Sequence, residues 1–234
     1  MFTERRYPLK AVLHWTKREI IFFFCLSSLV TALYEVLDIM WLQIPLTPVG
    51  LIGTAVAFMV GFQNNAAYDR IWEARKIWGG IVNTSRSLII TVKDSFYIHN
   101  SANSKDETAE LKVIANRHIA WLTALRYAMR TKKEWEATYE MNHKKTNFAY
   151  GVPEKEMAIE DEMKPHLSEE EFNYVMSKEN KPNAIINLQS KHFKRLTDEG
   201  KVWDFTLLKL QDMLQELTAL QGKSERIKNF PYPK

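Results

Sequence analysis

One stretch of the chain, Ile44 to Arg75, changes from apolar to polar within a single helical turn and becomes charged from Asp69 onward. Residues 44–62 contain no charged side chain. At ~1.5 Å rise per residue, a helix over them spans about 28 Å, close to the ~30 Å hydrocarbon core of a bilayer. Polar Gln63 follows, and no glycine or proline interrupts the sequence from there to Arg75. The pattern predicts one helix that leaves a membrane and continues into a water-facing domain.

A second apolar segment, Ile20 to Leu42, precedes this helix and predicts a first membrane helix. Pro45 and Pro48 mark the turn between the two helices. Further upstream, five basic side chains alternate with apolar ones, which is typical of an interfacial amphipathic helix or of an ordinary surface helix. The predicted division is an interfacial helix at 1–19, a transmembrane hairpin at 20–62 and a cytosolic helical domain at 63–234.

The distribution of charge predicts the orientation of the hairpin. Basic residues precede the first span, Arg70 and Arg75 follow the second, and the connecting loop has none. The positive-inside rule therefore places both ends in the cytoplasm. Glu35 and Asp38 would then lie near the outer mouth and raise the local cation concentration. We expect a multi-pass protein of the plasma or inner membrane, with its N-terminus and bulk domain cytoplasmic.

The rest of the chain shows helical spacing of apolar residues and no alternation typical of strands, which predicts an all-α fold. Gly79 and Gly80 mark either a weak point in a helix or a close approach of two backbones. Later helices are expected over Ile77–Phe96, Glu107–Thr131 behind a Ser104 cap, Ser168–Ser177 with a capping box to Glu171, Ala184–Glu199 before Gly200, and Trp203–Leu220.

Composition and motifs exclude several classes of function. A net charge of +4 is mild for a nucleic-acid binder, so no nucleic-acid partner is expected. Cys25 is the only cysteine, which excludes a disulfide framework and a thiolate metal site. The sequence has no phosphate loop, no histidine pair with metal-ligand spacing and no nucleophile elbow. We expect no enzyme activity, no cofactor and no metal.

Two further features have a structural interpretation. His118 lies on an apolar helix face and is expected to be a satisfied core or interface histidine rather than a ligand. The acidic runs at 160–162 and 169–171 lack the alternating oxygen ligands and central glycine of a calcium loop. They are interpreted as solvated helix faces.

Thr54, Phe58 and Phe62 recur at i, i+4 and i+8, on one face of the central helix. This stripe either packs on the preceding span or faces an axis shared by several copies of the chain. Small residues on the other sides would let neighbouring helices approach closely. A ring of phenylalanine edges presents positive partial charge and can gate by dewetting. Two spans per chain cannot enclose a pore, so the second alternative requires an oligomer.

The string AVAFMVGFQNNAAYDRIWEARKIWGG resembles the signature of the bacterial bestrophins, the prokaryotic branch of the bestrophin ion channels. The segments RHIAWLTALRYAMR, KPNAIINLQSKHFKRL and LQGKSERIKNFPYP extend this resemblance over nearly the whole chain, most weakly at 132–180. It implies a homopentamer in the lipid bilayer with a central pathway for permeant inorganic ions, either chloride or monovalent cations.

The resemblance also implies site residues. The three hydrophobic rings of the family's pore neck match Thr54, Phe58 and Phe62, and Thr54 departs from the usual aliphatic residue. A second, cytosolic constriction matches Thr206 or an adjacent residue. The family has two further membrane helices after the segment matching NFPYP, so the chain resembles a shortened member. In the animal members of the family, the acidic cluster that binds calcium also lies after the segment matching NFPYP.

Polar residues follow the neck on the same helix. Asn64 and Asn65 are candidates for amide dipoles just below it. Asp69, Arg70, Glu73 and Arg75 are expected to form structural pairs between helices or subunits rather than to line the pore. The alternative to a channel is a membrane-anchored helical scaffold or sensor, in which the hairpin is only an anchor.

Overall fold

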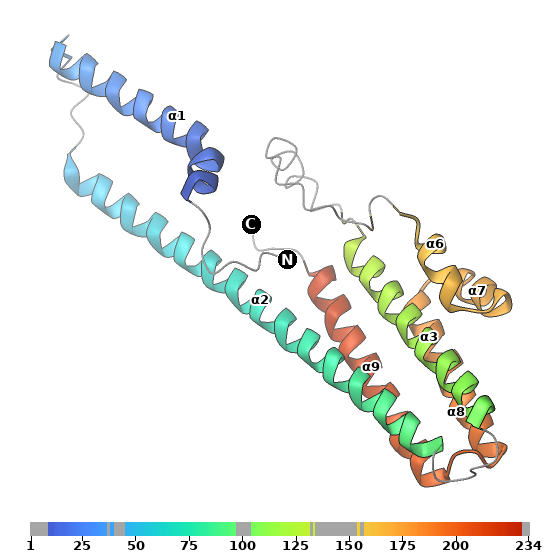
Figure 1. The fold of residues 1–234 in the computed structure, drawn as a ribbon. Coiled ribbons are helices and arrows are strands. Elements are labelled where there is room, and N and C mark those ends of the chain that lie inside the picture. Colours follow the sequence, from blue (N-terminus) through green and yellow to red (C-terminus); the bar gives the residue numbers. More distant parts are fainter. Residues whose placement is uncertain are drawn as a thin grey trace. The chain divides into compact units, whose positions relative to one another are not determined.

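The computed structural model describes residues 9–36, 38–39, 45–96, 104–131, 133, 154 and 157–230. Every regular element in these ranges is a helix, which confirms the predicted all-α fold (Figure 1). The elements are α1 (Leu9–Val36), α2 (Leu46–Phe96), α3 (Ser104–Arg130), α6 (Ile159–Met163), the 3-10 helix η3 (Lys164–His166), α7 (Glu169–Met176), α8 (Lys181–Asp198) and α9 (Asp204–Asn229). Residues 134–153, which belong to the weakest part of the resemblance, lie outside the described residues.

Helix α1 joins two segments that the sequence suggested were separate. It runs without a break through residue 20, because no glycine or proline interrupts 9–36 and the charged residues at 17–19 are compatible with a helix. It ends at Val36 rather than at Leu42. Asp38 follows with a φ of 47°, a left-handed conformation that cannot continue the helix. The interfacial role of residues 1–19 stays a prediction, and residues 1–8 lie outside the described part.

Two stretches are long and apolar enough to cross a membrane. They are Thr16–Val36, with a mean hydropathy of 1.7, and the candidate stretch Leu46–Ser95, with a mean hydropathy of 1.6 in its most apolar window. No residue of either apolar window is buried within the chain. An apolar helix without protein cover is suited to lipid or to another chain, since soluble proteins bury such surfaces.

Helix α2 continues well past Arg75 and includes the segment predicted as a separate helix over 77–96. It passes through Gly79 and Gly80 without interruption, so these glycines do not end the helix, and a weak point there stays a prediction. A Cβ atom added at Gly80 would come within 2.9 Å of Cδ2 of Leu220 on α9. The neighbour is a side chain, so Gly80 packs against Leu220, and the alternative prediction, a close approach of two backbones, stays a prediction.

A compact unit comprises residues 66–141 and 149–234 and is called the soluble unit after its predicted environment. Its hydrophobic core lies between the second half of α2 and helices α3, α8 and α9, which run alongside one another in Figure 1, while α6 and α7 pack on α3 and α8. The largest buried side chains come from all four long helices: Leu88, Trp121, Phe193 and Leu217. The predicted apolar faces supply these residues.

Helix ends in this unit follow the predicted signals at three places. Ser168 and Glu171 form the reciprocal capping box at the start of α7, as predicted. Asn180 accepts a hydrogen bond from the backbone N–H of Asn183 at 3.0 Å, and α8 begins at Lys181 because Pro182 fits a first helical turn. Gly200, with a φ of 71°, ends α8, and the backbone N–H of Lys201 donates to the Leu196 carbonyl at 2.9 Å.

Three predicted boundaries in this unit are wrong. Helix α8 begins at Lys181, three residues before the predicted start at Ala184. Helix α3 begins at Ser104 itself, three residues before the predicted start at Glu107. Helix α9 continues past Gly222 to Asn229, although its end was predicted at Leu220. A glycine costs a helix only about 1 kcal/mol. Packing of Ile227 on the core and pairing of Arg226 with Glu73 offset that cost.

Candidate functional site

The stripe on α2 is exposed to the surroundings of the chain. The side chains of Phe58 and Phe62 are 63% and 72% exposed, with ring centroids 6.5 Å apart and ring planes 25° from parallel. The hydroxyl of Thr54 donates to the Gly50 carbonyl at 2.9 Å, which satisfies this polar group inside an apolar helix. No described residue of the same chain covers the two rings. The stripe is thus available to a second copy, to ions or to lipid.

The small residues of the same helix leave space around it. A Cβ atom added at Gly50, Gly53 or Gly61 would meet no other atom within 4 Å. Glycine at a membrane helix surface allows another helix to come close. The two asparagines directly after the apolar segment, Asn64 and Asn65, are also exposed. The structure therefore presents both the predicted neck and the predicted amide dipoles on uncovered surface.

Below this segment, two of the four predicted pairing residues connect α2 to the end of α9. The guanidinium of Arg70 donates to the carbonyls of Ile227 and Phe230, the second at 2.6 Å. These carbonyls belong to the C-terminal end of a helix, where backbone acceptors lack helical partners and a cation is favourable. Glu73 forms an ion pair with Arg226 of α9. Both contacts lie within one chain.

The other predicted residues are placed differently. Arg75 lies over the ring of Trp72 on its own helix, with its guanidinium carbon 5.9 Å from the ring centroid. Asp69 is exposed on α2. Thr206 lies half-buried in the first turn of α9, next to Phe205, which is 82% exposed. Thr206 and Arg226 are thus at opposite ends of the same helix.

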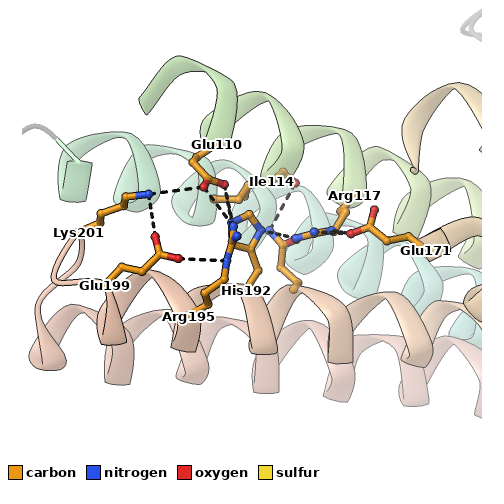
Figure 2. A network of polar contacts seen from close by, with 9 residues as sticks. Glu110, Ile114, Arg117, Glu171, His192, Arg195, Glu199 and Lys201 are labelled. Atoms are coloured by element: carbon orange, nitrogen blue, oxygen red, sulfur yellow. Dashed lines mark hydrogen bonds and ion pairs between the residues drawn. The ribbon is translucent and has the colours of Figure 1, made fainter. Parts of the chain in front are cut away.

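Sequence reasoning missed a charged network between α3, α7 and α8, which Figure 2 shows. Arg117 of α3 donates to Glu171 of α7 through Nε at 2.8 Å. Glu110 lies on the same face of α3, about two turns before Arg117. It binds His192 at 2.7 Å and Arg195 at 3.1 Å, both on α8. The spacing of seven between Glu110 and Arg117 was visible in the sequence, but nothing there indicated their partners.

This network corrects the interpretation of the acidic runs as solvated faces. Glu171 and Glu162 each form an ion pair with an arginine of α3, namely Arg117 and Arg126. Burial alone would raise the pKa of Glu171. The hydrogen bond and positive charge of Arg117, together with Ser168, outweigh it and lower that pKa. Only the remaining acids of the two runs face solvent.

The network favours one protonation state of His192. Arg117 contacts Nδ1 of His192, and a guanidinium can only donate, which favours a neutral ring with Nδ1 as the acceptor. The proton on Nε2 then points to Glu110. Burial and the nearby charge of Arg117 both lower the pKa of His192, and Glu110 opposes them.

His118 is a core residue, as predicted, but it is not fully satisfied. Its ring stacks on Trp121 with centroids 5.4 Å apart, and its Nε2 atom has no hydrogen-bond partner among the described residues. Burial lowers the pKa of His118 to about 4. Oε1 of Gln189 likewise has no partner in the described part of the chain, and both residues line a cavity of about 10 Å³. No group of three or more potential metal ligands occurs among the described residues.

A family model described as "Bacterial/Fungal Bestrophin protein" matches residues 9–234. The chain belongs to the bacterial and fungal bestrophin family. This membership confirms the resemblance of the sequence motifs, and together with the two uncovered apolar helices it makes the chain a membrane protein. The family assignment offers no support for an enzyme.

Several curated relatives share part of this sequence. The voltage-dependent anion channel-forming protein YneE of Escherichia coli K12 is 25% identical over 192 residues, which cover 82% of this chain and 52% of that protein. The voltage-dependent anion channel-forming protein RSc3414 of Ralstonia nicotianae is 26% identical over 214 residues, or 90% and 58% of the two chains. The chain thus spans about half the length of the curated relatives it matches.

Solved structures support the fold. A mutant of a bacterial bestrophin homolog from Klebsiella pneumoniae superposes with a TM-score of 0.70 at 21% identity, covering 93% of this chain and 69% of that one. A second mutant of the same homolog gives a TM-score of 0.68 at 23% identity, covering 92% and 69%. At this identity the similarity concerns the arrangement of helices.

Proposed function

We propose that this chain is a subunit of a homopentameric bestrophin-type ion channel. Five copies of α2 would surround a pathway across the bilayer, with a neck formed by Thr54, Phe58 and Phe62. The observation that supports this most strongly is the exposure of both phenylalanine rings on an apolar helix that continues directly into a folded soluble unit. Two apolar helices cannot enclose a pathway, so the exposed stripe can line one only among several copies.

The proposal extends to the small inorganic ions that pass. The names of YneE and RSc3414 describe anion channel-forming proteins, which favours anions such as chloride. The positive edges of the phenylalanine rings favour anions as well. Exposed Glu35 and Asp38, near the proposed outer mouth, favour monovalent cations. The reversal potential of the reconstituted protein under asymmetric salt distinguishes the two.

Other predicted residues take subsidiary roles in this proposal. Asn64 and Asn65 would offer amide dipoles to ions leaving the neck, and Thr206 would form the cytosolic constriction at the start of α9. Asp69, Arg70, Glu73 and Arg75 would hold helices together below the neck. The N-terminus and the soluble unit would be cytoplasmic, with residues 1–19 at the interface, 20–62 in the membrane and 63–234 in the cytosol.

Ion flux into liposomes tests the neck directly. Replacing Phe58 or Phe62 by alanine removes a ring from the constriction and should raise conductance by roughly severalfold or shift the reversal potential, because a wider, wetter constriction holds ions less selectively. Met59→Ala is the matched control, since Met59 is 65% exposed but lies on another side of α2. Unchanged conductance and ion preference in both phenylalanine variants would contradict the neck assignment.

A membrane-anchored scaffold or sensor without conduction is the second candidate. It is favoured by the charged network of the soluble unit, which links α3, α7 and α8 and does not include the proposed neck on α2. The two candidates differ in assembly. Light scattering of the protein in detergent should give the mass of about five subunits for a channel, and that of a monomer or dimer for a scaffold.

A further inference from the structure

His192 lies at the centre of a charge-balanced cluster. The cationic groups around it are Arg117 on α3, Arg195 on α8 and Lys201 in the turn between α8 and α9. The carboxylates are Glu110 on α3, Glu171 on α7 and Glu199 at the end of α8 (Figure 2). The three positive and three negative charges balance only while the ring of His192 is neutral. Its side chain is 2% exposed, so water cannot screen an added charge.

The neutral ring joins two residues of α3 that are seven positions apart. Its Nδ1 accepts from Arg117, and its Nε2 donates to Oε2 of Glu110 at 2.7 Å. Nη2 of Arg195 lies 3.0 Å from the same Nε2 and donates to Glu110 instead, at 3.1 and 3.2 Å. A second proton on His192 would need to sit on Nδ1, directly against the guanidinium of Arg117.

Glu110 extends the cluster to the turn before α9. Nζ of Lys201 lies 3.8 Å from Oε1 of Glu110 and 2.7 Å from Oε2 of Glu199. Gly200, in its left-handed conformation, gives this turn its direction. The turn leads within a few residues to Asp204, where α9 begins, and to Thr206. The placement of the first turn of α9 thus depends on contacts that include Glu110.

We propose that His192 is a positioning residue for the start of α9. As a neutral ring it leaves Glu110 shared with Lys201 of the α8–α9 turn. Protonation sets an added charge against Arg117 and draws Glu110 toward the ring and away from Lys201, which releases that turn and moves the proposed constriction at Thr206. The step to the constriction rests on the channel function proposed above. Burial and Arg117 lower the pKa of His192, so the ring is neutral at pH 7 and the release belongs to acidic conditions.

Hydrogen exchange of the whole chain in detergent tests the positioning step without any flux. In the wild type, protection of residues 196–206, corrected for intrinsic exchange, should fall below pH 6.5 by up to about tenfold per pH unit. His192→Gln keeps a donor and an acceptor but cannot titrate, so its protection should not depend on pH. His166→Gln, a half-buried residue of η3 outside the cluster, should behave as the wild type.

Lys201→Gln provides a second variant, because Lys201 is partly exposed and its replacement should not prevent folding. It should lower protection of the turn at pH 8 while leaving α3 and α8 protected. Equal pH dependence in the wild type and His192→Gln, or an unaltered turn in Lys201→Gln, would overturn the proposal.

Flux in liposomes separates this inference from the proposed function. A pH-dependent flux that becomes pH-independent in His192→Gln would support the link to Thr206. If hydrogen exchange depends on pH through His192 while the flux does not depend on pH, that link alone would be overturned. Absence of flux at every pH in wild type and variants would overturn the channel proposal and the link together, and exchange would still report on the turn.

Discussion

The two halves of α2 have opposite environments on one continuous helix. Up to Phe62 the helix is apolar and uncovered, and large side chains such as Phe58 are mostly exposed. In its second half, Ile81 and Leu88 are buried against other helices, and charged residues pair with α9. The comparison shows that the first half depends on a solvent or partner outside the chain. The second half depends on contacts that the chain makes with itself.

The strongest test of this difference compares aromatic residues in the two environments. Trp121→Ala in the core should lower the free energy of unfolding by about 3–5 kcal/mol, because Trp121 is 1% exposed and its loss leaves a cavity. Phe23→Ala on α1, where the ring is 65% exposed, should change the unfolding of the soluble unit by less than about 0.5 kcal/mol. Denaturant titration in detergent, followed by far-ultraviolet circular dichroism, measures both. Equal losses would remove the distinction.

Acid should lower the free energy of unfolding of the soluble unit, which covers the second half of α2, through His118 on α3. Burial lowers the pKa of His118 from 6.5 to about 4, so the unfolded chain binds more protons between these values. Stability is therefore full above pH 6.5 and is lost as the pH falls toward 4, by roughly 3 kcal/mol at most. His118→Phe should flatten this part of the stability profile. An unchanged profile in that variant would show that other groups cause the acid sensitivity.

The contact of α2 with α9 can be tested at adjacent glycines. Gly80→Val should destabilise the soluble unit by about 1–3 kcal/mol, because a side chain there meets the buried Leu220. At Gly79 an added Cβ meets nothing within 4 Å, so Gly79→Val should be neutral or slightly stabilising. Thermal unfolding of the two variants side by side gives the difference. Similar melting temperatures would argue against the packing of Leu220 on Gly80.

The smallest expected effect is at a helix terminus. Ser168→Ala removes the side chain that caps α7 and should cost about 1 kcal/mol. Thr197→Ala on α8, where the hydroxyl only donates to the Phe193 carbonyl of its own helix, is the control and should cost less. Denaturant titration measures the free energy of unfolding of both variants. The loss should be larger in Ser168→Ala if the capping box contributes as the geometry indicates.

Much of the fold could be predicted because local patterns are short-ranged. The capping box at Ser168, the terminating Gly200 and the apolar faces all act within one or two helical turns, and each occurs as predicted. The errors arose where tertiary packing outweighs local preference. Helix α9 passes through Gly222 because Arg226 and Ile227 gain contacts beyond it.

The candidate site divides in the same way. A run of apolar residues is a property of composition, so Thr54, Phe58 and Phe62 could be placed on one helix face from their spacing, and the family from the motif around Tyr68 to Arg75. The partners of Arg70, Glu110, Arg117 and His192 lie more than fifty positions away along the chain. Only the tertiary structure brings such residues together, because no local rule of spacing specifies which distant charge a buried charge will meet.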